Sequence, residues 1–207
     1  MVRQRARIRF CKQGDLRLIG HRDLARLLER LFRRAGLRLG MSEGFHPKPR
    51  MSFPSALALG IEGLDEVMEL ELAESCTADE LLARLARHAV PGLSFPRVEM
   101  LPAGTKKARV RSSTYELSIP VARQRDAALR VERLLGKLAD SAGEGPDAAL
   151  LRRSLEEIGL REGVLRFRLR ARRERSAGPR DVLAATGLDD LEPQGVYLTR
   201  SGVELEP

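Results

Sequence analysis

An α+β protein made of two successive β-α-β-β-α-β units is the fold that the sequence predicts. Apolar residues alternate with charged ones in several short segments, which is the period of a half-buried strand. Between these segments, leucines recur every three or four residues, which is the period of an amphipathic helix. The order of the two patterns is β-α-β-β-α-β and occurs twice along the 207 residues. This order is typical of the ferredoxin-like fold, so we expect two tandem ferredoxin-like units.

The first predicted unit covers residues 1–104. In chain order, its expected elements are a strand at 5–13, a helix at 21–36, strands at 52–60 and 65–74, a helix at 77–90 and a strand at 93–101. Thr77 and Glu80 have the types and spacing of a capping box at the start of the second helix. The loop 41–49, which reads MSEGFHPKP, is inserted after the first helix.

The second predicted unit covers residues 109–207. Its clear elements are strands at 113–121, 164–173 and 195–205 and helices at 122–143 and 178–187. The segment 150–159, LLRRSLEEIG, has helical propensity where the repeated pattern requires a strand. The sequence leaves the state of this segment open.

Positive charge is concentrated at the N-terminal end. The chain holds 37 Lys and Arg against 29 Asp and Glu, a net charge of +8, and its pI is near 10.3. Residues 1–50 contain 14 of the basic and 4 of the acidic residues, whereas residues 51–104 contain 3 and 9. This asymmetry favours a polyanionic partner for the N-terminal part.

Motifs of several common functions are missing from the sequence. It has no glycine-rich phosphate loop of the Walker or Rossmann type and no GxSxG nucleophile elbow. Cys11 and Cys76 are isolated, so they form no zinc or iron–sulfur ligand set, and we expect neither a metal nor a cofactor. No apolar run reaches the ~20 residues of a membrane span, and the start lacks the apolar segment of a signal peptide. We therefore expect a cytoplasmic protein.

The predicted helix 21–36 carries a continuous basic stripe that is the strongest candidate for phosphate binding. The residues expected to contact nucleic acid are Arg22, Arg26, Arg30, Arg33, Arg34 and Lys48. Arginine ladders on the strands 5–13 and 164–173 are possible extensions of this surface, although sequence alone does not place their faces. The alternative is a solvated surface whose arginines pair with glutamates of the same chain.

Three residues are weak candidates for catalysis. His21 begins the predicted helix, Asp23 lies in its first turn, and His46 lies in the loop that follows. The helix separates the two histidines by about 24 Å at 1.5 Å per residue, so a shared acid–base site requires the loop to fold back. The alternative is that His21 supports the helix start and His46 hydrogen-bonds the turn.

The N-terminal region resembles the radical SAM-linked (radical SAM-associated) family. This domain of unknown function occurs alone or fused to the C-terminus of B12-binding-type radical SAM proteins. The resemblance is carried by FCKQGDLRLIGHRDL, RRAGL and SEGFHPKP, with Gly60 and Glu66 beyond them. Its loop motif comprises Ser42, Gly44, Phe45, Pro47 and Pro49. Gly20 departs from the family pattern, which has serine there, so a hydroxyl cap is lost.

The resemblance implies an accessory protein of a radical SAM enzyme. With the basic stripe, we expect such a protein to bind RNA or a ribosomal substrate through its N-terminal face. One alternative is an enzyme that processes or modifies RNA with His21 or His46. The other is a protein-interaction subunit whose arginines meet an acidic partner and which has no affinity for RNA.

Overall fold

The computed structural model describes residues 4–139, 146–172 and 176–207 and has an α+β fold. Five helices and eight strands lie in these ranges. The chain divides into two compact units, residues 1–109 and residues 110–207, which are described separately below. None of the helices in the described ranges is both long enough and apolar enough to cross a bilayer.

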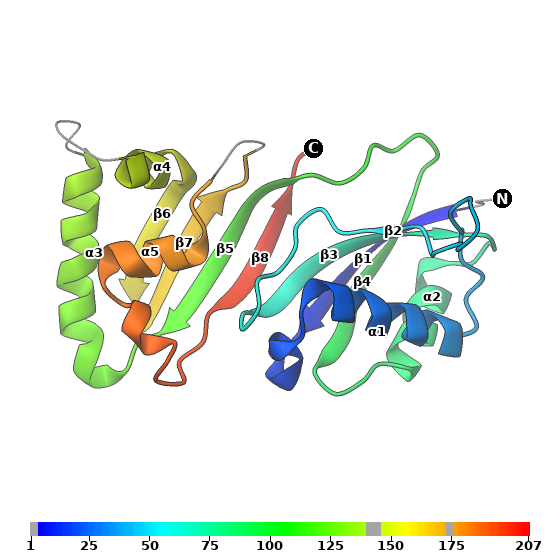
Figure 1. Cartoon of the computed structure of the whole chain (residues 1–207), viewed down its shortest axis with the longest axis horizontal. Coiled ribbons are helices and arrows are strands. Elements are labelled where there is room, and N and C mark those ends of the chain that lie inside the picture. The colour runs from blue at the N-terminus through cyan, green and yellow to red at the C-terminus, as the bar shows by residue number, and fades with distance from the viewer. Residues whose placement is uncertain (1–3, 140–145, 173–175) are drawn as a thin grey trace. The chain divides into compact units, whose positions relative to one another are not determined.

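The first unit is an antiparallel sheet with two helices (Figure 1). Its elements in chain order are β1 (Gln4–Lys12), a short 3-10 helix (Gly14–Leu18), α1 (His21–Arg34), β2 (Met51–Ser52), β3 (Glu62–Leu72), α2 (Ala78–Arg87) and β4 (Leu93–Leu101). β1 pairs with β4 on one side and with β3 on the other, and the short β2 pairs with β3. The strand order is therefore β4-β1-β3-β2, with every pair antiparallel.

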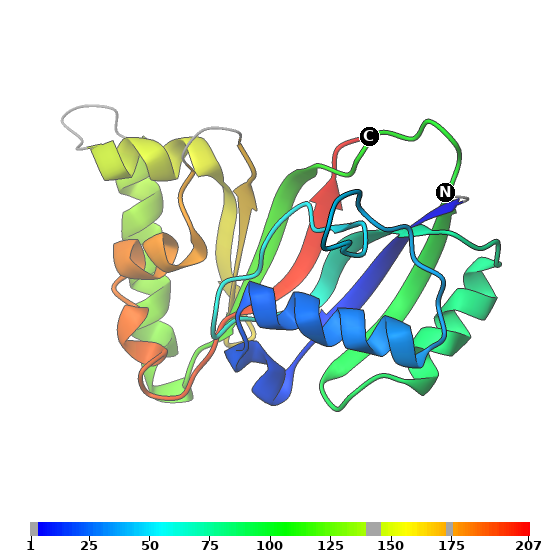
Figure 2. The same ribbon diagram turned by 45° about the vertical axis from the view of Figure 1, so that its right-hand side comes forward.

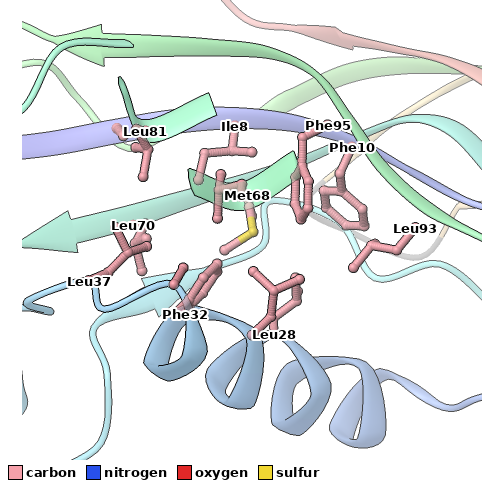
Figure 3. Close-up of a cluster of buried hydrophobic side chains, with 14 of the residues drawn as sticks. Ile8, Phe10, Leu28, Phe32, Leu37, Met68, Leu70, Leu81, Leu93 and Phe95 are labelled. Carbon is pink, nitrogen blue, oxygen red and sulfur yellow. The ribbon is translucent and has the colours of Figure 1, made fainter. Parts of the chain in front are cut away.

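The core of the first unit lies between the helices and one face of this sheet (Figures 2 and 3). Alternation along β1 places Ala6, Ile8 and Phe10 in this core. Leu28 and Phe32 of α1 pack against the same face and are fully buried. The apolar residues of the strand period and those of the helix period therefore pack together in one core.

The second unit repeats this arrangement. Its elements are β5 (Val110–Ser118), α3 (Gln124–Ala139), α4 (Pro146–Ser154), β6 (Leu155–Arg161), β7 (Val164–Arg170), α5 (Pro179–Thr186) and β8 (Thr199–Leu205), with short 3-10 helices at Val121–Arg123 and Asp189–Leu191. Antiparallel pairing gives the order β8-β5-β7-β6. Tyr115 and Phe167, opposite each other on β5 and β7, stack with ring centroids 5.5 Å apart.

Most of the predicted elements are present, and the capping box is confirmed. The Thr77 hydroxyl accepts from the Glu80 N–H at 3.2 Å, and the Glu80 carboxylate accepts from the Thr77 N–H at 2.8 Å. The predicted strand at 52–60 is wrong, because β2 ends at Ser52 and the chain then leaves the sheet. Pro54 has no N–H for a ladder, and Gly60 has a φ of +85°, which lies in the region that favours glycine.

The segment 150–159, whose state the sequence left open, is divided between two elements. Its first part completes α4 and its second part begins β6, with the change between Ser154 and Leu155. The Ser154 hydroxyl donates to the Leu150 carbonyl at 2.9 Å and accepts from the Ala177 N–H at 3.0 Å. This buried serine fixes the point at which the helix gives way to the strand.

Candidate nucleic-acid interface

One side of α1 is apolar and buried, and the other side is a surface of arginines. Its exposed basic residues are Arg22, Arg26, Arg30, Arg33 and Arg34, which we call the α1 basic face. From Arg22 to Arg33 the helix rises about 16 Å, a length over which one strand of a nucleic-acid duplex carries about five phosphates.

Most of the α1 basic face is not neutralised by the protein. Arg26 forms an exposed ion pair with Asp23 at 3.4 Å, and Arg34 donates to the His88 carbonyl at 3.4 Å. Arg22, Arg30 and Arg33 form no hydrogen bond or ion pair with any residue that the structure describes. Their guanidinium groups therefore keep their full capacity to bind an anion.

The arginines of β1 are arranged differently. They lie on the sheet face opposite the core, where Arg7 pairs with Glu69 at 3.0 Å and Arg9 with Asp65 at 2.5 Å. Arg5 donates to the carbonyls of Thr105 and Lys106 and lies 3.8 Å from Glu69. These half-buried side chains are committed to interactions within the unit, so they do not extend the α1 basic face.

The arginine ladder of β7 is also paired. Each outward arginine meets a glutamate of a neighbouring strand, in the pairs Arg166–Glu116, Arg168–Glu157 and Arg170–Glu156. Arg168 donates a hydrogen bond to Glu157, and this bond together with the negative charge of the carboxylate raises the pKa of Arg168. For this ladder, intrachain pairing describes the surface better than an open phosphate-binding face.

Two of these β7 arginines line a shallow groove of about 350 Å³ in the second unit. Arg166 and Arg168 border it, together with Thr114, Glu157 and Ser201. Both guanidinium groups already bind carboxylates at 2.6 Å. They are therefore less available to bind an anion than the unpaired arginines of the α1 basic face.

The start of α1 is held by aromatic packing. The ring of His21 lies edge-on against Phe53, with centroids 4.9 Å apart, and Phe53 in turn lies edge-on against Phe10 at 6.3 Å. Asp23 is exposed in the first turn, where a carboxylate complements the helix dipole. This geometry matches the supporting role that the sequence offered as the alternative for His21.

The segment FCKQGDLRLIGHRDL shapes the turn before α1. Lys12, only 1% exposed, donates to the Ile19 carbonyl at 2.9 Å. The Gly14 N–H donates to Glu62 at 2.7 Å, and the Gly60 N–H to the Arg17 carbonyl at 2.9 Å. Sequence reasoning assigned no role to Lys12. A signal was present in the strand period, since Lys12 continues the inward register of Ile8 and Phe10.

The segment SEGFHPKP lies in a closed loop, residues 40–50, which we call the Phe45 loop. The Ser42 N–H donates to the Lys48 carbonyl at 2.8 Å, and the Lys48 N–H donates to the Ser42 hydroxyl at 2.9 Å. Gly44 has a φ of +117°, and Phe45 at the tip is fully exposed, at 103% of its reference area. Phe45 therefore does not pack in the core, and the neighbouring His46 is exposed as well.

The structure records no interaction between the two candidate histidines. Within the described residues, no hydrogen bond or ring contact joins His21 to His46. Nor does any group of three or more His, Cys, Asp or Glu side chains in those ranges have the arrangement of a metal site. A joint acid–base role for His21, Asp23 and His46 stays a prediction.

Comparison with known proteins gives a family without an assigned activity. No curated protein matches the chain. A crystal structure of an unknown protein from Galdieria sulphuraria is similar over 99% of both chains, with 12% identity and a TM-score of 0.30. A family model described as "Uncharacterized protein conserved in bacteria" matches residues 5–175. Because this match covers most of the sequence, the chain belongs to the DUF2344 family.

Proposed function

We propose that this protein binds RNA, or a ribosomal substrate that presents RNA, through the α1 basic face. The observation that carries the proposal is the contrast between two sets of arginines. Those of β1 and β7 are paired with carboxylates, whereas Arg22, Arg30 and Arg33 have no partner in the described chain. Unpaired, exposed arginines along one helix are what a phosphate backbone requires.

The proposal includes an accessory role beside a radical SAM enzyme of the B12-binding type. Support for this partner comes from the motifs FCKQGDLRLIGHRDL and SEGFHPKP, which resemble the radical SAM-linked family. The chain would present the RNA, and the partner would supply the radical chemistry. Mixing the two purified proteins and measuring sedimentation tests this part separately. A complex supports it, and two independent species at micromolar concentration contradict it.

Each unit is best interpreted as a ferredoxin-like domain. In support, the first unit has the strand order β4-β1-β3-β2 and the second has β8-β5-β7-β6, both fully antiparallel. We also place the protein in the cytoplasm, where the two free thiols Cys11 and Cys76 would stay reduced.

A salt titration with two charge-matched variants tests RNA binding. The first variant replaces Arg22, Arg30 and Arg33 by glutamine, and the control replaces Arg166, Arg168 and Arg170, so both lose three positive charges. Affinity for a fluorescent single-stranded RNA is measured by anisotropy between 50 and 300 mM salt. Each lost phosphate contact reduces the slope of log K against log salt by about 0.7, so the α1 variant should lose about 2.

The control decides whether position or net charge matters. We expect the β7 variant to keep most of the wild-type slope, since its arginines are occupied by glutamates. Equal losses in the two variants would contradict a specific role of α1. Wild-type protein without salt-dependent affinity would overturn RNA binding altogether and would favour the protein-interaction alternative.

A further inference from the structure

The Phe45 loop is closed by hydrogen bonds and holds an aromatic ring in solvent. All six phenylalanines of the chain lie in the described residues. Four of them are at most 7% exposed, and Phe53 is half-buried against Phe10 and His21. Phe45 alone is fully exposed. In a protein whose aromatic content is 4%, a ring left outside the core is an unusual use of a large apolar side chain.

The backbone beneath Phe45 is fixed at both ends. The Gly40 N–H donates to the Glu71 carbonyl of β3 at 2.7 Å, and the Glu71 N–H donates to the Arg50 carbonyl at 3.0 Å. Arg50 also donates through Nε to the Met41 carbonyl at 3.0 Å. Both ends of the loop are thus joined to the sheet edge, and the ribbon views show the loop clear of α1 (Figures 1 and 2). These bonds reduce the entropy that the loop loses when its tip binds a partner.

The conformation at the tip depends on Gly44. Its φ of +117° lies where residues with a side chain are strained, yet a Cβ there would meet nothing within 4 Å. The glycine is therefore needed for the backbone turn and not for space. This turn presents the next residue, Phe45, outward.

The loop carries one exposed lysine close in sequence to Phe45. Lys48 is exposed and its ammonium has no partner in the described residues, whereas the carboxylate of Glu43, also exposed, lies 3.7 Å from the Arg50 guanidinium. An exposed aromatic ring beside a free lysine suits a nucleotide, because the ring stacks on the base and the ammonium binds the phosphate. Docking of Phe45 into an apolar pocket of a protein partner is less favourable, because it would remove water from the nearby charge of Lys48.

We propose that Phe45 stacks on an unpaired base, so that the RNA class bound is single-stranded or looped and not a continuous duplex. This inference rests on the proposed RNA binding and specifies its substrate. The α1 basic face supplies affinity for the phosphates, and the Phe45 loop supplies preference for an unstacked base. Base–aromatic stacking of this kind accounts for about 5- to 150-fold in affinity when the ring is removed.

The absence of tryptophan from the chain allows a direct test. Phe45→Trp introduces a single indole at the tip, and Val121→Trp introduces one at a second exposed position, 84% exposed, as the control. Each protein is titrated with a single-stranded RNA oligomer and with a blunt duplex of the same length. We expect the oligomer to quench the indole at position 45 in a saturable way, with little effect of the duplex and little effect at position 121.

Affinity measurements with Phe45→Ala complete the test. We expect this variant to bind the single strand about tenfold or more weakly and the duplex as wild type does. Retained single-strand affinity together with unquenched indole would overturn stacking, even while RNA binding stands. An indole that shifts to shorter wavelength only when a protein partner is added would also overturn it, in favour of an apolar pocket. If wild-type protein binds neither the single strand nor the duplex, the proposed function itself is refuted.

Discussion

Replacing Glu69 by glutamine tests whether the arginines of β1 are structural. The Glu69 side chain is 3% exposed, and its Oε1 accepts from Arg7 Nη2 at 3.0 Å and from the Ala108 N–H at 3.1 Å. Arg5 Nε, which has no hydrogen-bond partner, lies 3.8 Å from its other oxygen. Removing the charge therefore leaves two half-buried guanidinium groups without their shared counterion.

The magnitude follows from the burial of this group. Breaking a buried ion pair by removing one partner costs about 3–5 kcal/mol. The arginines keep 19% and 23% exposure, and glutamine retains one acceptor oxygen, so we expect a somewhat smaller cost than this, about 2–4 kcal/mol. The matched control is Glu116→Gln, which breaks the more exposed pair with Arg166 and should cost less than about 1 kcal/mol.

Native-state hydrogen exchange resolves the effect by unit. In Glu69→Gln, amides of β1 and β3 should exchange about 30- to 700-fold faster, whereas those of β5 and β7 should keep their wild-type rates. Unchanged exchange in β1 and β3 would refute the structural assignment. The assignment of Arg7 to a structural role would also be refuted if Arg7→Gln weakened RNA binding as much as Arg30→Gln does. Arg7 would then be part of the interface.

Three further predictions concern stability. Thr77→Ala removes the hydroxyl that caps Glu80, so we expect a loss of about 1 kcal/mol in urea unfolding of the first unit. Gly92→Ala, at a φ of +82°, would place its Cβ on a backbone carbonyl oxygen, and we expect a lower thermal midpoint than that of Gly104→Ala, where no atom lies within 4 Å. The hydrogen bond from Arg123 lowers the pKa of Asp190 from its ordinary 3.8. The stabilisation is therefore present above this ordinary value and is lost as the pH falls through the lowered pKa, so Asp190→Asn should reduce the difference between thermal midpoints at pH 5 and pH 3.

The sequence predicts elements well where the hydrophobic period is clear. β4 has the predicted bounds, 93–101, and α1 and α2 end within a few residues of their predicted limits. The predicted strand at 52–60 is wrong, because the apolar residues after Pro54 do not alternate regularly with polar ones. The segment is rich in apolar residues but lacks the two-residue period of a strand. Leu57 in this segment is buried from an irregular segment and not from a strand.

The roles of the arginines could not be predicted in the same way. Whether an arginine is free depends on the register between strands that lie far apart in sequence. Arg7 meets Glu69 directly across β1 and β3, 62 residues later. The glutamates that alternate along 65–74 were a usable signal, because a basic and an acidic strand at adjacent positions in a sheet neutralise each other. On α1, where partners would be three or four residues away, the sequence showed the shortage of carboxylates directly.

The motif of the N-terminal region therefore combines two kinds of requirement. Lys12, Gly14 and Gly60 are explained by hydrogen bonds that shape the turn before α1, so their loss would act through folding. Ser42 and Gly44 are explained by the closure and the turn of the Phe45 loop. Neither folding nor loop closure uses the ring of Phe45, which contacts solvent alone. The fold does not require the ring of Phe45, whereas the loop requires the residues that hold this ring in solvent. Phe45 is therefore the residue at which we expect a binding partner to make contact.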